Sequence, residues 1–526
     1  MKQLVMLGII FSMNVQAQKY VSGYVYEDTN NNGKKDRKEA GIAGVAVSNG
    51  CDVTLSDAQG FYSLPVEDDN IIFVIKPSGY RFPLNENNRP VFYYTHKPKS
   101  NPDAFQYKVT APTGKLPESV DFALHKNSES DNFTALIFGD PQMYTPEEVD
   151  YFTRGVVSEV SGMQNVSLGI SLGDIAGRDL GMHEAYIQAM KEVDIPWYNL
   201  MGNHDMNLDA PADSLSDETF EMNFGPANYA FNYGKVHFIL LDDILYPDPR
   251  GSRGYWGGFR KSQLDFVENS LKYVDKNHLI VLAFHIPLRN VENSFRGSDL
   301  RRLFDLLKEF PYTVSLSAHT HTQQHLFFGK EENWHQEKPH HQFISGTSCG
   351  DWYSGEINKR NLPETTMRDG TPQGYSFMRF SGNRYVIDYK AIGKTADYQM
   401  NIFCPKVVPH NERTTAGIYV NFFMGKADDV VEYRVDQGEW KPMQHLIEPD
   451  PAFLDLLHRW DFTDELMPGD RPSNAVNCMH LWRTGVPTGL STGEHQIEVR
   501  ATDMFGRTFF GNSSYRIELA KERRVD

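Results

Sequence analysis

The stretch YNLMGNHDMN, residues 198–207, shows a fold signal and a chemical signal side by side. An apolar, strand-like run from Ile195 to Met201 ends at a glycine, which permits a tight turn. Asn203, His204 and Asp205 follow directly. An amide, an imidazole and a carboxylate in a row suit cation binding and proton transfer. For this triplet taken alone, a simple polar turn is the alternative.

The same arrangement recurs along the central part of the chain, where strand-like runs alternate with helical stretches. This alternation predicts an α/β domain with a largely buried sheet. The predicted helices lie near residues 146–160, 180–193, 260–273 and 297–310, and in the third Leu264, Val267 and Leu271 share one face. Five strand-like runs end in polar clusters: Asp140 and Gln142 in FGDPQ, Asp174 in LGDIAGRD, Asn203 to Asp205 in MGNHD, His285 in AFH, and His319 and His321 in SAHTHT. Open α/β sheets bind ligands at the carboxyl ends of their strands, so we expect the five clusters to converge on one crevice.

The residue types in these clusters predict two divalent ions. Carboxylate, amide and imidazole ligands favour Mn, Fe or Zn, and the lack of thiolates argues against a closed structural zinc site. Seven ligands exceed the need of one catalytic metal with an open position, but they fit a pair of ions about 3.5–4 Å apart with a bridging carboxylate. His204, between Asn203 and Asp205, is then predicted to donate a proton, with Asp205 orienting its ring.

The ordered set of motifs resembles the calcineurin-like metallophosphoesterases over about residues 133–395. The resemblance implies a four-layer αββα sandwich with a two-metal site. It implies that one metal is held by Asp140, Gln142, Asp174 and His321, and the second by Asp174, Asn203, His285 and His319, with Asp174 bridging. In the implied reaction a hydroxide bridging the metals attacks phosphorus in line, and His204 protonates the leaving oxygen while Asp205 steers its ring.

Two positions depart from the pattern of that family. The first motif usually reads Asp-x-His, whereas Gln142 stands here in place of the histidine. Ala318 replaces the usual glycine before the last histidine pair. A neutral amide oxygen in place of an imidazole should change how strongly the first site binds a metal and which metal it prefers. The identity of that metal is therefore open.

The two flanks of this domain are predicted to be β-sandwiches, so the chain of 526 residues is multidomain. We expect an N-terminal antiparallel sandwich over residues 18–126, a linker at 125–132, the catalytic domain over 131–395 and a C-terminal sandwich over 396–526. The N-terminal part is similar to the prealbumin-like modules of bacterial surface proteins, and the whole arrangement to exported bacterial members of the family.

The N-terminal segment DTNNNGKKDRKE has the spacing of a calcium-binding loop. Its ligands would be Asp28, Asn30, Asn32, Asp36 and Glu39, with Gly33 at the sharp turn and Lys34 contributing its carbonyl. The flanks look like strands rather than helices, so the loop would be inserted in a sandwich. A turn rich in Asn and Gly that binds no metal is the alternative.

Residues 1–17 are predicted to be a signal peptide, with Lys2 before an apolar run and a cleavage site after Ala17. We therefore expect an exported, periplasmic or secreted protein, with a membrane anchor as the alternative. No later segment reaches the roughly 20 apolar residues that span a bilayer. The net charge of −17 argues against a nucleic-acid-binding surface.

Further residues have weaker signals. Arg178 is a candidate phosphate contact or a surface residue, and Trp352 and Tyr353 are candidates for a pocket wall or for the core. His335, His340 and His341 are expected in a polar loop without a ligand role. Of the four cysteines, Cys404 and Cys478 are the candidate disulfide, and four unpaired thiols are the alternative.

Together these features predict a secreted, dinuclear-metal-dependent phosphoesterase whose substrate is a small-molecule, lipid or glycan phosphoester. We expect a diester rather than a monoester substrate. The competing hypothesis is a calcium-dependent surface or binding protein whose phosphoesterase domain is inactive. The sequence does not determine the natural substrate, the metals or the oligomeric state.

Overall fold

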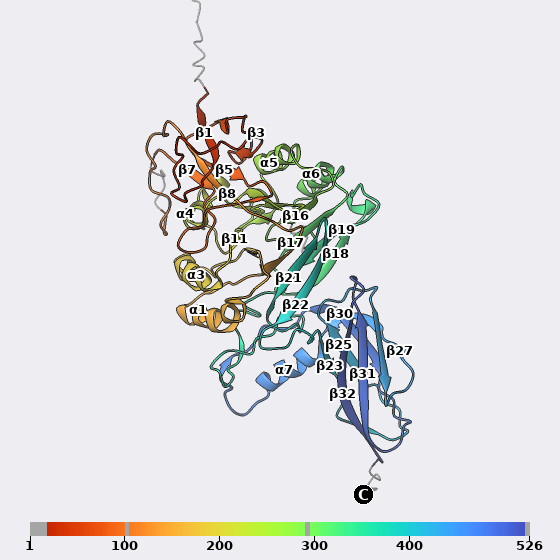
Figure 1. The fold of residues 1–526 in the computed structure, drawn as a ribbon. Coiled ribbons are helices and arrows are strands. Elements are labelled where there is room, and N and C mark those ends of the chain that lie inside the picture. Colours follow the sequence, from red (N-terminus) through yellow and green to blue (C-terminus); the bar gives the residue numbers. More distant parts are fainter. Residues whose placement is uncertain (1–17, 100–104, 290–294, 521–526) are drawn as a thin grey trace, which may run out of the picture.

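The computed structural model describes residues 18–99, 105–289 and 295–520. Within them the chain forms three sheet-rich parts, which follow one another from the red N-terminal end to the blue C-terminal end in Figure 1. The predicted signal peptide, residues 1–17, lies outside the described residues. In the described ranges, no helix is long and apolar enough to cross a membrane.

The N-terminal part contains two four-stranded sheets that share one core. Their orders are β4-β1-β8-β6 and β3-β2-β5-β7. The strands are β1 (Tyr20–Glu27), β2 (Ala46–Ser48), β3 (Val53–Leu55), β4 (Phe61–Pro65), β5 (Asn70–Ile75), β6 (Tyr80–Arg81), β7 (Tyr93–His96) and β8 (Phe122–Lys126). The expected purely antiparallel pairing is wrong at one place, since β1 and β8 run parallel. The long connection between β7 and β8 lets the chain enter β8 from the same end as β1.

The segment 125–132, expected to be a polar linker, is fixed between the N-terminal and central parts. The Glu129 side chain is only 2% exposed, and its carboxylate lies 2.5 Å from the Nζ of Lys76, which is equally buried. The second carboxylate oxygen of Glu129 accepts hydrogen bonds from the backbone N–H groups of Gly79 and Gly234. This buried ion pair ties the N-terminal part to the central domain.

The central domain has two sheets that pack face to face, with helices on their outer faces. The first sheet has the order β11-β10-β9-β21-β22 and the second β12-β13-β16-β17-β19-β18. The strands are β9 (Asn132–Phe138), β10 (Leu168–Ser171), β11 (Trp197–Asn199), β12 (Tyr229–Tyr233), β13 (Val236–Leu240), β16 (Leu279–Ala283), β17 (Thr313–Ser317), β18 (Gln324–Phe328), β19 (His340–Ile344), β21 (Gly374–Ser381) and β22 (Arg384–Ala391), with the small pair β14 (Ile244–Leu245) and β15 (Trp256–Gly257) beside them. All residues of β10, β13 and β16 are buried, as expected for central strands covered on both faces.

The helices form the two outer layers. Helices α1 (Pro146–Phe152), η1 (Thr153–Val157), α2 (Ser158–Val160), α3 (Met182–Met190) and η2 (Lys191–Val193) cover the first sheet, and α5 (Lys261–Leu271) and α6 (Gly297–Leu307) cover the second. The predicted apolar face of α5 is confirmed, because Leu264, Val267 and Leu271 are buried. The short elements α4 (Glu218–Phe224), η3 (Asp213–Leu215) and η4 (Lys330–Glu332) were not expected, because a single turn or two shows little periodicity.

The C-terminal part is a second two-sheet structure with its own core. Its strands are β23 (Met400–Phe403), β24 (Val407–Pro409), β25 (Gly417–Phe422), β26 (Val430–Val435), β27 (Lys441–Pro442), β28 (Gln444–Pro449), β30 (Asn477–Gly485), β31 (Gly493–Thr502) and β32 (Thr508–Glu518), in the orders β23-β25-β30-β28 and β24-β32-β31-β26-β27. Helix α7 (Pro451–Asp461) lies next to the central domain, and β20 (Gly355–Glu356) pairs with β29 (Gly469–Asp470) across the boundary. The candidate disulfide between Cys404 and Cys478 is absent, and the alternative of four unpaired thiols is confirmed: Cys404 lies beside Ser513 and Cys478 beside His480.

Candidate metal centre

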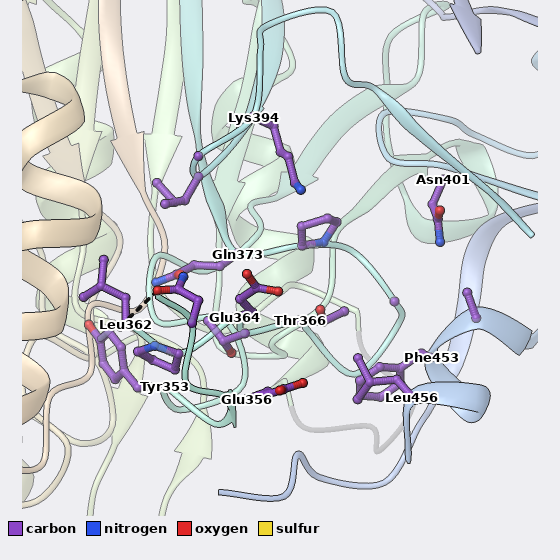
Figure 2. Close-up of a pocket in the computed structure, with 18 of the residues that line it drawn as sticks. Tyr353, Glu356, Leu362, Glu364, Thr366, Gln373, Lys394, Asn401, Phe453 and Leu456 are labelled. Carbon is purple, nitrogen blue, oxygen red and sulfur yellow. Dashed lines mark hydrogen bonds between the residues drawn. The ribbon is translucent and has the colours of Figure 1, made fainter. Parts of the chain in front are cut away.

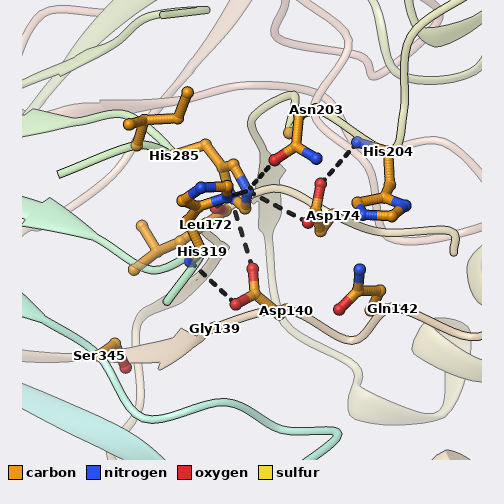
Figure 3. A network of polar contacts seen from close by, with 12 residues as sticks. Gly139, Asp140, Gln142, Leu172, Asp174, Asn203, His204, His285, His319 and Ser345 are labelled. Carbon is orange, nitrogen blue, oxygen red and sulfur yellow. Dashed lines mark hydrogen bonds and ion pairs between the residues drawn. The ribbon is translucent and has the colours of Figure 1, made fainter. Parts of the chain in front are cut away.

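The five polar clusters lie beyond the carboxyl ends of β9, β10, β11, β16 and β17, and they meet between the two sheets. Figure 3 shows the side chains of Asp140, Asp174, Asn203, His285 and His319 pointing toward a common space. The His285 Nε2 lies 3.2 Å from Asp174 Oδ2, 3.1 Å from Asn203 Oδ1 and 3.2 Å from His319 Nδ1. The predicted convergence of segments far apart in sequence is therefore present.

The backbone around these side chains is unusual. Five of the predicted ligands have positive φ angles, a region that residues other than glycine seldom adopt: Asp140 (32°), Gln142 (38°), Asp174 (47°), His319 (70°) and His321 (51°). Each such residue costs on the order of 1–3 kcal/mol, and this kind of strain is concentrated at functional sites. The loops are thus held in their conformations by the surrounding structure.

Gly202, which ends the run in the opening stretch, is required for close packing of two loops. A Cβ at this position would lie 2.1 Å from the Asp174 backbone nitrogen and 2.3 Å from Asp174 Oδ1. Gly173 has a similar role, because its Cβ would lie 2.7 Å from His285 Nδ1. The glycines therefore let the Asp174, Asn203 and His285 loops approach one another.

The site fits divalent cations because it holds two buried oxygens that accept no hydrogen bond from the protein, although His285 Nδ1 lies 3.5 Å from one of them, Asp140 Oδ1. Asp140 Oδ1 and Gln142 Oε1 are buried and lack a hydrogen-bond partner, although such atoms are nearly always paired in folded proteins. In addition, ligand atoms of Asp174, His285 and His319 lie within 4.8 Å of one another. Oxygen and imidazole donors of this kind suit the metals predicted from the sequence.

The pKa shifts differ among the predicted ligands, and those of His319 and His321 favour the metal-binding form. Burial raises the pKa of Asp140 well above 3.8, against the opposing effect of His285. Burial would lower the pKa of His285, but Asp174 and Asp140 outweigh it and raise that pKa to about 10. Burial lowers the pKa of His319 to about 3 and that of His321 to about 4. The two latter rings are therefore neutral, which is the form that binds metal ions.

The structure corrects the predicted partnership between Asp205 and the ring of His204. The Asp205 carboxylate is fully buried and accepts hydrogen bonds from the backbone N–H groups of Ile175, Ala176 and Gly202, and it contacts His183 Nε2 at 3.0 Å. The reason is geometric: consecutive side chains in this turn point in different directions. Asp205 therefore fixes the loop that follows Asp174.

The ring of His204 has a different neighbour. Its Nδ1 contacts the backbone carbonyl of Gly177, and its backbone N–H donates to Asp174 Oδ1 over 2.8 Å. The ring is half-buried beside the cluster, with Tyr144 in an edge-on contact at 6.1 Å between centroids. Sequence analysis missed His183 and Tyr144, since neither lies in a motif of ligand residues.

The three residues predicted to contact substrate have different surroundings. Arg178 is exposed, and its backbone carbonyl accepts a hydrogen bond from the Tyr107 hydroxyl. The Trp352 ring stacks on His321 with 4.2 Å between centroids. Tyr353 is buried, and its hydroxyl donates to the Pro141 carbonyl over 2.6 Å, so it supports the first ligand loop rather than facing substrate at the metals.

Tyr353 also borders a separate cavity between the central domain and helix α7. Figure 2 shows this cavity, whose volume is about 600 Å³. Its lining includes Glu356 and Lys394 of the central domain and Phe453 and Leu456 of α7. Among its lining residues there is no predicted metal ligand.

Two histidines expected in a polar loop lie instead in a core strand. His340 and His341 are buried in β19, where His340 contacts the hydroxyls of Thr313 and Ser315. His335 is exposed and pairs with Asp305. The segment KPHHQF has the composition of a loop, because polar residues are rare in buried strands. In this strand the His340 ring is tolerated because its two nitrogens are paired with the hydroxyls of Thr313 and Ser315.

The predicted calcium loop is held together by hydrogen bonds between its own side chains and backbone. Asp28 accepts hydrogen bonds from the backbone N–H groups of Asn32 and Gly33, and Glu39 accepts them from Thr29 and Asp36. The side-chain amides of Asn30 and Asn32 both donate to Asp36 Oδ2. Lys34 belongs to the same turn, its N–H bonded to Asn32 Oδ1.

Comparison with known proteins identifies three matched segments in order. Family models match residues 29–112 (N terminal of Calcineurin-like phosphoesterase), 133–323 (Calcineurin-like phosphoesterase) and 342–509 (C terminal of Calcineurin-like phosphoesterase). The last match begins within β19, so it includes β21 and β22, which complete the first central sheet. No curated protein matches the chain.

Two solved structures illustrate the similarity of this chain to known proteins. A purple acid phosphatase from yellow lupin (Lupinus luteus) seeds is 11% identical with a TM-score of 0.35, and the match covers 71% of this chain and 66% of that one. Vps29 of Chaetomium thermophilum is 8% identical with a TM-score of 0.20, covering 73% of this chain and 98% of that one. This chain thus spans about two thirds of the length of the lupin protein.

Proposed function

We propose that this chain, which belongs to the calcineurin-like phosphoesterases, is an exported hydrolase that uses two metal ions to cleave a phosphodiester. Membership of the family supports a metal-dependent phosphoric ester hydrolase. The single observation that carries the proposal is the pair of buried oxygens without a hydrogen-bond donor, Asp140 Oδ1 and Gln142 Oε1, beside the Asp174, His285 and His319 cluster.

The residues at this centre divide into two sets around Asp174. Asp140, Gln142 and His321 would hold one ion, and Asn203, His285 and His319 the other, with Asp174 shared between them. When bound, such a pair supplies Lewis acidity and an activated water nucleophile. The protein contributes the fixed geometry, since the strained loops place their donors before any ligand arrives.

His204 is suited to exchange a proton with the leaving oxygen. The Gly177 carbonyl accepts a hydrogen bond from Nδ1, which therefore keeps its proton, and Nε2 is the nitrogen that takes up a second proton and passes it to the leaving oxygen. The bond from the His204 backbone N–H to Asp174 Oδ1 keeps the ring beside the cluster. Asp205 does not contact the His204 ring, and its role is to hold the backbone of residues 175 and 176 by hydrogen bonds.

The substrate is proposed to be a small-molecule, lipid or glycan phosphodiester met outside the cytoplasm. Support comes from the predicted signal peptide at residues 1–17 and from the exposed Arg178 near the His204 loop. A protein of net charge −17 holds an anionic phosphoester only where local positive charge dominates, and a pair of dications provides that charge.

The N-terminal loop is proposed to bind one structural Ca²⁺ through Asp28, Asn30, Asn32, Asp36 and Glu39 and the Lys34 carbonyl. Burial of the two terminal carboxylates, Asp28 and Glu39, supports this role. Calcium should raise the thermal midpoint of the wild-type protein, and the Glu39→Gln variant should respond less.

Hydrolysis of two model substrates tests the catalytic proposal. With added Mn²⁺ the protein should hydrolyse bis-p-nitrophenyl phosphate faster than p-nitrophenyl phosphate. His204→Ala should reduce turnover by roughly 10²–10⁴-fold, while the metal content measured by atomic spectroscopy stays the same. A folded, metal-loaded protein that is inactive on both substrates with every divalent metal would instead support a calcium-dependent binding protein with an inactive central domain.

A further inference from the structure

A buried polar network connects the C-terminal sandwich to the loop that carries His319 and His321. Its members are fully or almost fully buried and come from both domains: Gln323, Asp369, Asn421, Asp450 and His480. Gln323 lies two residues after His321, Asn421 lies on β25, and His480 lies on β30. The network therefore reaches the metal centre along the chain.

Gln323 is the member that joins the His321 loop to the C-terminal domain. Its backbone N–H donates to Asp369 Oδ2 over 2.7 Å, and its side-chain Nε2 donates to the carbonyl of Phe423, directly after β25, over 2.5 Å. The side-chain oxygen accepts a hydrogen bond from the backbone N–H of Gly346. The backbone N–H and both ends of the side-chain amide are therefore paired, so the position and orientation of the side chain are both fixed.

The protonation of His480 follows from its contacts. The Asn421 amide nitrogen faces two oxygens, the Asp369 carbonyl at 3.1 Å and Asp450 Oδ2 at 2.8 Å, so the amide oxygen must face His480. His480 Nδ1 lies 2.8 Å from that oxygen, and Nε2 lies 3.3 Å from Asp369 Oδ2. Both ring nitrogens face acceptors and both carry a proton, which makes His480 and Asp369 a buried ion pair.

A second contact ties the other loop beside the metals to the same domain. Asp351, directly before Trp352, accepts a hydrogen bond from the Ser473 backbone N–H over 2.5 Å. Trp352 stacks on His321, and His321 Nδ1 contacts the Gly350 carbonyl at 3.0 Å. Both loops that surround His321 are therefore anchored to the C-terminal sandwich.

We infer that the C-terminal sandwich is a positioning element of the metal centre, with Gln323 as its contact residue and the His480 to Asp369 pair holding Gln323 in place. The inference rests on the proposed metal-binding function. Apolar packing would be enough to hold two domains together, whereas directional polar contacts also fix the orientation of a loop. His319 and His321 have positive φ angles, and a loop in such conformations relaxes unless its neighbours hold it.

Mn²⁺ titration of the metal-stripped, full-length protein by calorimetry tests this inference. Gln323→Leu removes the side-chain contacts with Phe423 and Gly346, and Asp369→Asn removes the charge that faces His480 while keeping the shape of the side chain. His495→Gln is the matched control: it loses an ion pair with Asp436 on the other sheet of the same domain. Loss of supporting contacts around metal ligands typically weakens metal binding by about 10–100-fold, so we expect at least a tenfold loss in the two variants and less than twofold in the control.

The outcomes separate the two proposals. A wild-type protein that binds no Mn²⁺ refutes the proposed function, whereas Mn²⁺ affinity within twofold of wild type in both folded variants refutes the positioning role. Excess Mn²⁺ should restore the kcat of Gln323→Leu on bis-p-nitrophenyl phosphate, which a general folding defect would not allow. Loss of cooperative unfolding in both variants would also overturn the inference, because the network would then serve folding alone.

Discussion

Replacing Asp205 by asparagine separates the two roles that can be assigned to this residue. Its Oδ1 accepts hydrogen bonds from Ile175 and Ala176 and contacts His183 Nε2, all at 3.0 Å, and its Oδ2 accepts one from Gly202 at 2.9 Å. In the variant, an NH₂ group replaces one oxygen and faces a backbone N–H donor. The shape of the side chain is unchanged, so the effect reports on hydrogen bonding.

The expected cost follows from these contacts. The lost bond at Gly202 is worth about 1.5–3 kcal/mol, since hydrogen bonds to charged groups lie in that range, and each remaining bond to a neutral amide is weaker by roughly 1 kcal/mol. These terms are not fully additive, so we expect the free energy of unfolding to fall by about 4 kcal/mol, or the thermal midpoint by roughly 8–16 °C for a domain of this size.

Urea unfolding, Mn²⁺ titration and a pH–rate profile would measure the effect. Asp179→Asn is the control, because Asp179 is exposed, accepts a hydrogen bond from the Gly181 N–H and lies beside Tyr107, so its loss should cost less than about 1 kcal/mol. Mn²⁺ binding should weaken, because the loop after Asp174 is released, while the pH profile at saturating Mn²⁺ stays in place. A variant as stable as wild type, with its pH profile displaced, would show that Asp205 acts on the His204 ring after all.

Three further changes have defined outcomes. Glu129→Gln should lower the free energy of unfolding by about 3–5 kcal/mol in urea unfolding, since it leaves the buried Lys76 charge without its partner carboxylate. Replacing both Glu129 and Lys76 by apolar residues should recover most of this loss, and no recovery would contradict the argument from the buried ion pair. Burial would lower the pKa of His480, but Cys478 and Asp369 beside it raise that pKa well above 6.5. The pair therefore stabilises fully below pH 6.5 and loses its effect as the pH rises through the folded-state pKa, so the difference in urea midpoint between wild type and His480→Gln should shrink at alkaline pH; a constant difference would count against it. Gln142→His should bind Zn²⁺ about tenfold more tightly by calorimetry, because an imidazole replaces a neutral amide oxygen, and equal affinity would place residue 142 outside the metal site.

The sequence predicted the structure correctly where a residue type has one usual role, such as an apolar side chain in the core or a carboxylate or imidazole as a metal ligand. Ligand-type residues after successive apolar runs predicted the site at the carboxyl ends of the strands, and the apolar face of α5 followed from its period. It failed where a side chain could meet several partners. Asp205 lies next to His204 in sequence but bonds to the loop after Asp174, and His340 is buried in a strand that resembles a loop.

Local order along the chain determined the layered fold, the identity of the candidate ligands and the glycine that lets two of their loops meet. Only the tertiary structure decided which groups share a proton or a charge: Glu129 with Lys76, and His480 with Asp369. The physical reason is that secondary structure depends on neighbours a few residues apart, whereas burial and pairing of polar groups depend on contacts between segments more than 50 residues apart.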